Sequence, residues 1–387
     1  MRDEIVVSKA KSKKNYIWTC GGFTVDGADV WFVPYWENVL CRYNLITREI
    51  EDIITFPNAS ILIAASYNVK RSGERIIVIP AFERGVYIYD KKKKQMENIV
   101  INDEECPLEK YRHCIVHNDR VYMFPIGEKY VISIDLEGYG INKIKIPVGE
   151  RGMYVDYIQI ENKVYLVNLT ERITVFDLEN EEFSIYSAEN INMGEKYRTI
   201  NSIENNRLFL TSAEGNISIY NIQTQEIEKK IYSGGKHIDY SLRIDDKIYL
   251  FPHDNREPII RWECNNWHFS EIMFSSKDHE DDYINAFSEP ELVGDYIYIM
   301  DTHEECMYML DQECNILCKY KMKMMEMNEE VAKELFNCGK KQGKIYESPS
   351  VYATLEYYCA NIQQSNYENN DMKSKVGKEI YKSIARM

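Results

Sequence analysis

The sequence is poor in residues that interrupt regular structure, and it has no long apolar run. It contains only 10 prolines and 18 glycines in 387 residues, a composition that argues against a flexible or low-complexity chain. No apolar stretch of signal-peptide length stands at the start, and no run of 18 apolar residues occurs anywhere. These absences predict a protein that does not insert into a membrane and is not exported, and therefore a cytoplasmic location.

Signatures of the common catalytic and metal sites are also absent. The chain has no phosphate-binding loop, no dinucleotide-binding glycine pattern at a strand–helix junction, no nucleophile elbow and no kinase signature set. Its 7 histidines form no HxH or HExxH pair, and the CxxxC of Cys314 and Cys318 has no second cysteine pair nearby. We therefore expect no cofactor and no metal site, and we expect the 10 cysteines to be mostly reduced and packed as small apolar groups.

Positive charge is in short supply. The formal net charge is −15, from 47 basic and 62 acidic residues. An acidic surface repels a phosphate backbone, so nucleic acid is excluded as the expected partner. Aromatic residues are abundant, with 30 tyrosines, 13 phenylalanines and 5 tryptophans, and such residues favour β-strands.

One pattern recurs seven times along the chain. Its first part is a short apolar strand at Val30–Pro34, Ile76–Pro80, Val121–Pro125, Val164–Asn168, Leu208–Ser212, Ile248–Pro252 and Ile297–Asp301. A second strand begins 9 to 11 residues after the start of the first, at Leu40, Val86, Val131, Ile173, Ile217, Ile259 and Met307. Each second strand ends in Asp, Asn or Glu, side chains that can bond turn backbone and begin a tight turn.

Two further strands complete each unit. A third follows the pair, for example at Glu49–Ile54 and Gln95–Val100, and a looser one precedes it, for example at Ser60–Tyr67 and Tyr111–His117. Four strands in a unit of 40 to 49 residues match the period of a propeller blade. A single four-stranded sheet cannot bury its two apolar faces, whereas sheets stacked in a closed ring cover one another. The sequence therefore predicts an all-β fold, a seven-bladed β-propeller of four-stranded antiparallel blades.

This pattern resembles the kelch and WD-type propeller superfamily over roughly residues 15–323. Gly21-Gly22 is similar to the kelch diglycine but occurs only in the first unit, and no unit ends in the Trp-Asp pair of WD repeats. The resemblance implies the fold and carries no family site with it.

The segments outside the repeats predict different structure. We expect an N-terminal arm over residues 1–15, the propeller over 16–323 and a short helical C-terminal tail over 324–387. Helical spacing is found at Glu326–Phe336, Ser350–Ile362 and Lys375–Met387. These helices are expected to pack on the propeller; the alternative is that the last of them docks a partner.

A glutamate stands between the two strands of every repeated motif. The residues are Glu37, Glu83, Glu128, Glu171, Glu214, Glu257 and Glu304, the last followed by Glu305, and Arg84 is one of the cations that follow them. One interpretation is a ring of carboxylates around the channel that binds a basic peptide or another cationic ligand. The other is a set of salt bridges between blades, for which Arg112 and Arg198 are the candidate partners.

The same turns carry aromatic and imidazole side chains. Tyr35, Trp36 and Phe82 are candidate ligand anchors, because exposed rings at loop tips are costly unless they bury against something; the alternative is that they pack on the neighbouring blade. His253 and His303 accompany Glu257 and Glu304 and could ligate a divalent cation or serve as acid and base, although solvated histidines are the favoured interpretation. The leading hypothesis is a non-enzymatic module that binds a protein, a peptide or a cationic ligand, basic partners included. The alternative is a propeller enzyme, a lyase or hydrolase for a small glycan or cyclic substrate.

Overall fold

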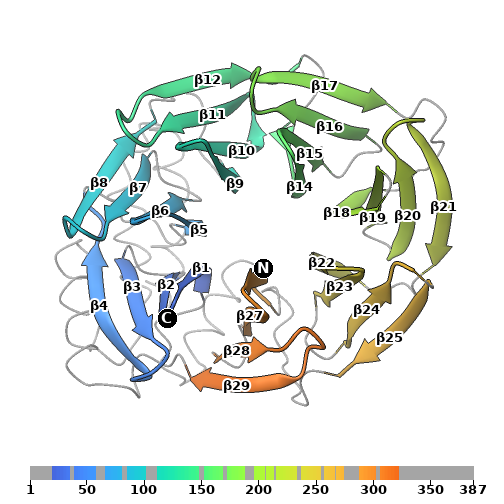
Figure 1. The fold of residues 1–387 in the computed structure, drawn as a ribbon. Helices are drawn as coiled ribbons and strands as arrows, with labels where there is room; N and C mark the ends of the chain where they lie inside the picture. The colour runs from blue at the N-terminus through green and yellow to red at the C-terminus, as the bar shows by residue number, and fades with distance from the viewer. Residues whose placement is uncertain are drawn as a thin grey trace, which may run out of the picture.

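The computed structural model forms seven β-sheets around a central opening (Figure 1). It describes residues 20–34, 39–57, 66–80, 85–101, 111–147, 152–168, 172–187, 196–204, 206–212, 215–232, 237–253, 257–265, 267–273, 287–301 and 306–321. The sequence prediction of a seven-bladed β-propeller with four-stranded antiparallel blades is confirmed. No helix that is long and apolar enough to cross a membrane occurs in these ranges.

The first four blades follow one another along the chain. Blade 1 comprises β1 (Cys20–Asp26), β2 (Asp29–Pro34), β3 (Val39–Asn44) and β4 (Glu49–Thr55), and blade 2 comprises β5 (Ser66–Ser72), β6 (Arg75–Pro80), β7 (Gly85–Asp90) and β8 (Gln95–Val100). Blade 3 comprises β9 (Tyr111–His117), β10 (Arg120–Glu128), β11 (Tyr130–Asp135) and β12 (Ile141–Lys145), and the short β13 (Gly152–Met153) pairs with the end of β10. Blade 4 comprises β14 (Asp156–Ile160), β15 (Lys163–Val167), β16 (Arg172–Asp177) and β17 (Glu182–Ser187).

Three more blades complete the ring. Blade 5 comprises β18 (Tyr197–Ile203), β19 (Arg207–Ser212), β20 (Asn216–Asn221) and β21 (Glu226–Tyr232); blade 6 comprises β22 (Ile238–Ile244), β23 (Lys247–Pro252), β24 (Ile259–Glu263) and β25 (His268–Ile272); blade 7 comprises β26 (Glu291–Val293), β27 (Tyr296–Asp301), β28 (Cys306–Leu310) and β29 (Ile316–Lys321). In every blade the first strand lies innermost and the fourth outermost (Figure 1).

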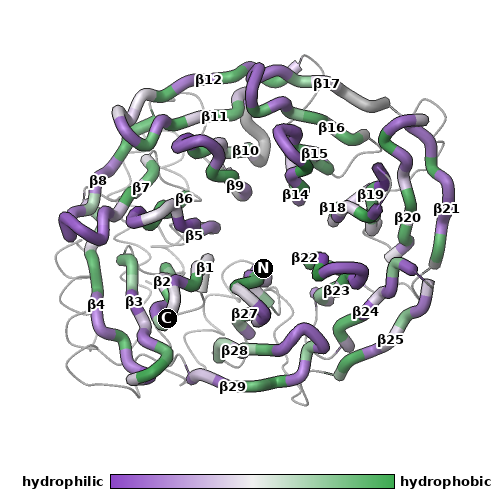
Figure 2. Tube along the Cα trace, viewed as in Figure 1, coloured by the Kyte–Doolittle hydropathy of each residue, from purple (hydrophilic) through white to green (hydrophobic). Residues whose placement is uncertain are grey.

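Burial explains why the second and third strands are the ones visible in the sequence. They lie in the middle of each blade and are covered on both faces by neighbouring blades, so they read as continuous apolar runs; β7 is buried over five successive residues. The outer strands alternate, as β8 does, because one of their faces meets solvent. Figure 2 shows the hydrophobic segments within the blades and hydrophilic residues at many inner strand ends near the opening.

The innermost strand of blade 2 lies later than the sequence suggested. The expected range was Ser60–Tyr67, but β5 spans Ser66–Ser72. The apolar residues at 61–65 favoured the earlier range, whereas antiparallel pairing fixes the strand by its register with β6, from Ser66 opposite Pro80 to Ser72 opposite Arg75.

The turns between third and fourth strands share one local design. In blades 1 to 5 the side chain that ends the third strand accepts hydrogen bonds from backbone N–H groups two and three residues later, as Asn44 does from Ile46 and Thr47 and Asp90 does from Lys92 and Lys93. A left-handed residue then closes the turn, at Arg48, Lys94, Tyr139, Glu181, Gln225, Trp267 and Cys314. The acidic and amide strand ends noted in the sequence therefore begin turns, as predicted.

Between Cys20 and Lys321, the part of the chain that the structure describes, blades 1 and 7 close the ring by packing, and no described strand of one pairs with the other. Phe23, Val30 and Phe32 share a buried cluster with Met300 and Met307. Glu291 of β26 adds a polar link, because its carboxylate accepts hydrogen bonds from the Thr24 hydroxyl at 2.9 Å and the Val25 backbone N–H at 3.1 Å. The contact between blades 1 and 7 therefore depends on side chains, and substitution of Glu291 can test its polar part.

Replacing Glu291 by glutamine should change how stability depends on pH. Burial raises the pKa of the Glu291 carboxyl, although hydrogen bonds from Thr24 and Val25 and the charge of Lys70 oppose the shift. The folded state thus holds this proton more tightly than the unfolded chain does. The stabilisation by the protonated form is complete below the unfolded pKa of about 4.3 and declines as the pH rises toward the folded pKa.

Because glutamine does not titrate, the comparison isolates this carboxyl. Urea unfolding of both proteins at several pH values should show the stability difference moving in favour of Glu291→Gln as the pH rises above about 4. A difference that stays constant, or that moves in favour of the wild type, would contradict a raised pKa.

The N-terminal arm at 1–15 and the helical tail at 324–387 lie outside the described residues, as do the three expected helices. The described part of the propeller runs from Cys20 to Lys321.

Candidate functional site

The antiparallel order places two kinds of junction at the same end of every blade: the link from second to third strand, and the link from one blade to the next. Most of the predicted ligand-face residues lie in these links and outside the described residues, namely Tyr35, Trp36, Glu37, Phe82, Glu83, Arg84, Glu171, Glu214, His303, Glu304 and Glu305. Three others have a described backbone. Glu128 ends β10, Glu257 is half-buried just before β24, and His253 directly follows β23.

A β-bulge recurs where the innermost strand begins at this end of the blade. In five blades the pairing with the second strand skips one residue, which is Gly21, Tyr67, Arg112, Arg198 or Asp239. A bulge bends the strand and re-aims a side chain. The bulge positions in blades 5 and 6 carry opposite charges, and there the two side chains meet.

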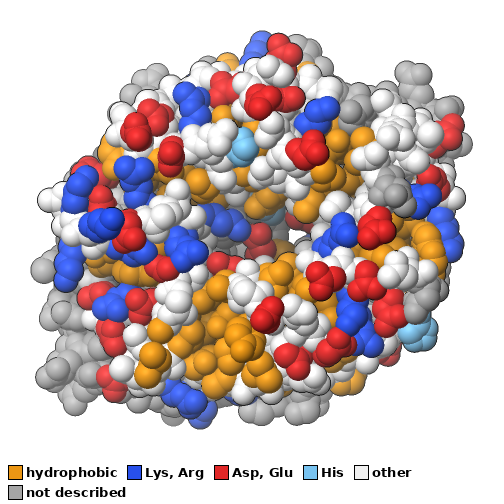
Figure 3. All heavy atoms as spheres, viewed as in Figure 1, with side chains coloured by type: hydrophobic (Ala, Val, Ile, Leu, Met, Phe, Trp, Pro, Cys, Tyr) orange, Lys and Arg blue, Asp and Glu red, His pale blue; other side chains and the backbone are white. Residues whose placement is uncertain are grey.

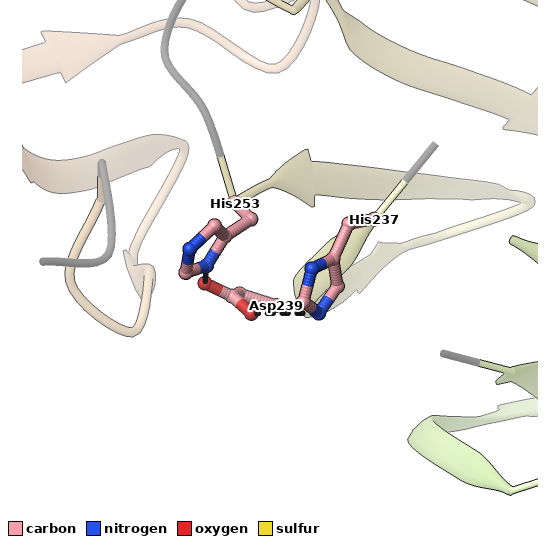
Figure 4. A group of neighbouring side chains, drawn as sticks. All are labelled: His237, Asp239 and His253. Carbon is pink, nitrogen blue, oxygen red and sulfur yellow. Dashed lines mark hydrogen bonds and ion pairs between the residues drawn. The ribbon is translucent and has the colours of Figure 1, made fainter. Parts of the chain in front are cut away.

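Asp239 is the centre of a polar cluster at this bulge (Figure 4). Its side chain is only 1% exposed. His253 Nδ1 lies 2.7 Å from Asp239 Oδ2, and His237 Nε2 lies 3.8 Å from Asp239 Oδ1. The two imidazole rings are stacked, with centroids 4.7 Å apart. One buried carboxylate thus faces two histidines that the sequence does not place together.

Arg198 reaches the same carboxylate from the neighbouring blade, where its guanidinium donates to Asp239 Oδ1. Burial pushes the pKa of Asp239 upward, but the His253 hydrogen bond and the charge of Arg198 outweigh it and hold the pKa below its usual value. Burial and the Arg198 charge lower the pKa of His237. Arg198 was expected to pair with a loop glutamate; among the described residues its partner is an inner-strand aspartate.

A second set of polar contacts joins blade 7 to blade 2. Glu289, just before β26, accepts hydrogen bonds at 3.3 Å from both Asn68 and Lys70 of blade 2. Desolvation would lower the pKa of Lys70, but the Glu289 carboxylate raises it well above its ordinary value. This ion pair neutralises charge within the channel, and Figure 3 shows charged side chains of both signs around the opening.

The cluster of Arg198, His237, Asp239 and His253 supports two kinds of chemistry. An imidazole oriented by a buried carboxylate is the arrangement of a general acid–base pair. Two imidazoles and one carboxylate are also a ligand set for a transition metal. The sequence analysis identified His253 but missed His237 and Asp239. The register of the β22–β23 hairpin, which pairs residue 238 with 252, was the signal that could have found them.

Comparison with known proteins identifies the fold alone. No family model and no curated protein matches the chain. Solved structures do match: the computationally designed Ika8 protein has a TM-score of 0.55 and 9% identity, over 80% of this chain and 88% of that one. Hsv2 from Kluyveromyces lactis gives 0.52 and 9% over 79% and 99%, and BamB from Moraxella catarrhalis gives 0.51 and 10% over 73% and 81%.

Proposed function

We propose that the protein is a non-enzymatic binding module that recognises a protein or peptide carrying positive charge. One observation carries the proposal: the seven repeated glutamates fall between the second and third strands of the seven blades, hence at one end of every blade. A rigid ring that presents one carboxylate per blade on one face would attract a cationic partner.

Two further features support this face. The formal net charge of −15 favours basic partners over acidic ones. Tyr35, Trp36 and Phe82 stand in the corresponding links of blades 1 and 2, and aromatic side chains are the commonest energetic anchors of protein interfaces. The propeller scaffold holds these links at fixed spacing, so little ordering free energy would be lost on binding.

A labelled model peptide of alternating lysine and alanine tests the charge recognition. Fluorescence anisotropy should show binding that weakens steeply from low to high salt, because exposed charges are screened over about 8 Å at physiological ionic strength. Changing Glu83, Glu128 and Glu171 together to glutamine should weaken binding at low salt by about tenfold, or about 1.4 kcal/mol.

The matched control changes the same charge at the other end of the blades. Glu49, Glu137 and Glu226 are exposed at the turns between third and fourth strands, and their replacement by glutamine should leave peptide affinity close to that of the wild type. Equal losses in both triple variants would show a diffuse charge effect and contradict a dedicated face. Glutamates that instead bridge blades would reveal themselves by a loss of thermal stability in the first variant.

The 2.7 Å contact between His253 and Asp239 favours a second candidate, an enzyme of the lyase or hydrolase class acting on a small glycan or cyclic substrate. His253 would be the acid or base and Asp239 its orienting carboxylate. Glu257, His303 and Glu304 would complete that site. Turnover that is abolished by His253→Ala while substrate binding persists would favour the enzyme over the binding module.

A further inference from the structure

We propose that His237, Asp239 and His253 form a binding site for a divalent transition-metal ion such as Zn²⁺, at the inner rim of blade 6. This inference goes beyond the proposed partner recognition and holds whether or not the glutamates contact a peptide. It rests on the backbone that positions the three side chains, on the spacing of their donor atoms and on the setting of the carboxylate.

The backbone fixes all three residues with respect to one another. The His253 backbone N–H donates to the His237 carbonyl oxygen at 2.8 Å, which extends the β22–β23 pairing to the two histidines. Asp239 is the bulged residue of β22, without a cross-strand partner in the register. The hairpin therefore sets the spacing of the two imidazoles, and the bulge directs the carboxylate toward them (Figure 4).

The donor atoms are close to the spacing that a metal ion requires. One nitrogen from each histidine and one carboxylate oxygen all lie within 4.8 Å of one another. Zinc bonds of 2.0–2.2 Å in a tetrahedral site place donors about 3.3 Å apart. The distances from His237 Nε2 to Asp239 Oδ1, 3.8 Å, and from His253 Nδ1 to Asp239 Oδ2, 2.7 Å, bracket that value.

His237 Nε2 supplies an independent observation. This atom is buried from solvent and has no hydrogen-bond partner among the described residues, although it faces the Asp239 carboxylate at 3.8 Å. A buried ring nitrogen without a hydrogen bond is unfavourable. A metal ion between His237 and Asp239 would satisfy it.

Arg198 sets the character of the site. By donating to Asp239 Oδ1 it orients the carboxylate so that Oδ2 faces His253, as partners of metal-binding carboxylates do. Its positive charge also offsets that of the single carboxylate, so the site should discriminate against Mg²⁺ and Ca²⁺, which depend on several oxygen ligands. Imidazole donors favour Zn²⁺, Ni²⁺ or Cu²⁺, and three protein ligands leave a position for water or a ligand group.

Metal titration of the purified full-length chain tests the proposal. After treatment with a chelator, calorimetry with Zn²⁺ should show one site per chain, and His237→Ala and His253→Ala should each weaken it by about 100-fold or more. His268→Ala is the matched control, because His268 is exposed on the outer strand β25. The Zn²⁺ affinity of this variant should equal that of the wild type. Circular dichroism and thermal melts verify that each variant is folded.

Cobalt substitution excludes a competing explanation, since cysteines such as Cys264 and Cys318 could bind Zn²⁺ through sulfur. Co²⁺ should give visible bands of a site with nitrogen and oxygen ligands, without the near-ultraviolet thiolate band, and His253→Ala should remove them. A thiolate band, equal affinity in the histidine variants, competition by equimolar Mg²⁺ or no bound metal would each overturn the proposal.

Discussion

Replacing Trp262 by alanine is expected to lower the free energy of unfolding by about 3–5 kcal/mol. Trp262 of β24 is fully buried in the cluster between blades 5 and 6, and its ring lies 4.6 Å from that of Phe209. Its indole N–H has no hydrogen-bond partner among the described residues. The loss should therefore be one of packing, through a cavity that two rigid sheets cannot close.

Urea unfolding measures this effect as a shift of the midpoint at constant slope. Met273→Ala serves as the control, because Met273 is an apolar side chain in a neighbouring part of blade 6 and is 67% exposed; its change should stay within about 0.5 kcal/mol. Trp262→Phe should cost less than Trp262→Ala, since a ring remains against Phe209. A loss below about 1 kcal/mol for the alanine variant would show that the blades repack around the gap.

Removal of the Asp239 carboxylate should have the second large effect, a loss of about 3 kcal/mol in the Asp239→Ala variant. The change leaves the Arg198 guanidinium, which is only 23% exposed, without its carboxylate, and it removes the carboxylate oxygen that lies 2.7 Å from His253 Nδ1. An uncompensated charge in a partly buried position costs more than the ion pair contributes when intact.

The double variant Arg198→Met with Asp239→Leu distinguishes this cause from a simple loss of packing. Because both charges disappear together, its loss of stability should be smaller than that of Asp239→Ala alone. Chelator-treated protein should be used for all three chains, so that bound metal does not contribute to the difference. A double variant that loses as much stability as Asp239→Ala, or more, would show that the uncompensated Arg198 charge is not the cause of the loss.

The fold could be predicted from the amino-acid sequence alone, because a blade has to bury its middle strands on both faces. Every unit therefore contains continuous apolar runs, such as Ile76–Pro80. Every unit also has an acidic or amide residue where the next turn begins, such as Asp90. The second strand begins 9 to 11 residues after the first in all seven units. This regular spacing excludes folds without a repeat. The innermost strand of blade 2 was misplaced because such strands line the channel with polar residues, Asn68 and Lys70 among them, and carry a weaker apolar pattern.

The polar cluster at the inner rim of blade 6 could not be predicted from the sequence. Asp239 and Arg198 are 41 residues apart and belong to different blades, so no local pattern relates them. His237 and Asp239 meet His253 because a hairpin register and a one-residue bulge re-aim their side chains, and a bulge leaves no apolar periodicity to read. Secondary structure is a local consequence of burial, whereas the ligand set of this cluster is created by pairing between distant residues.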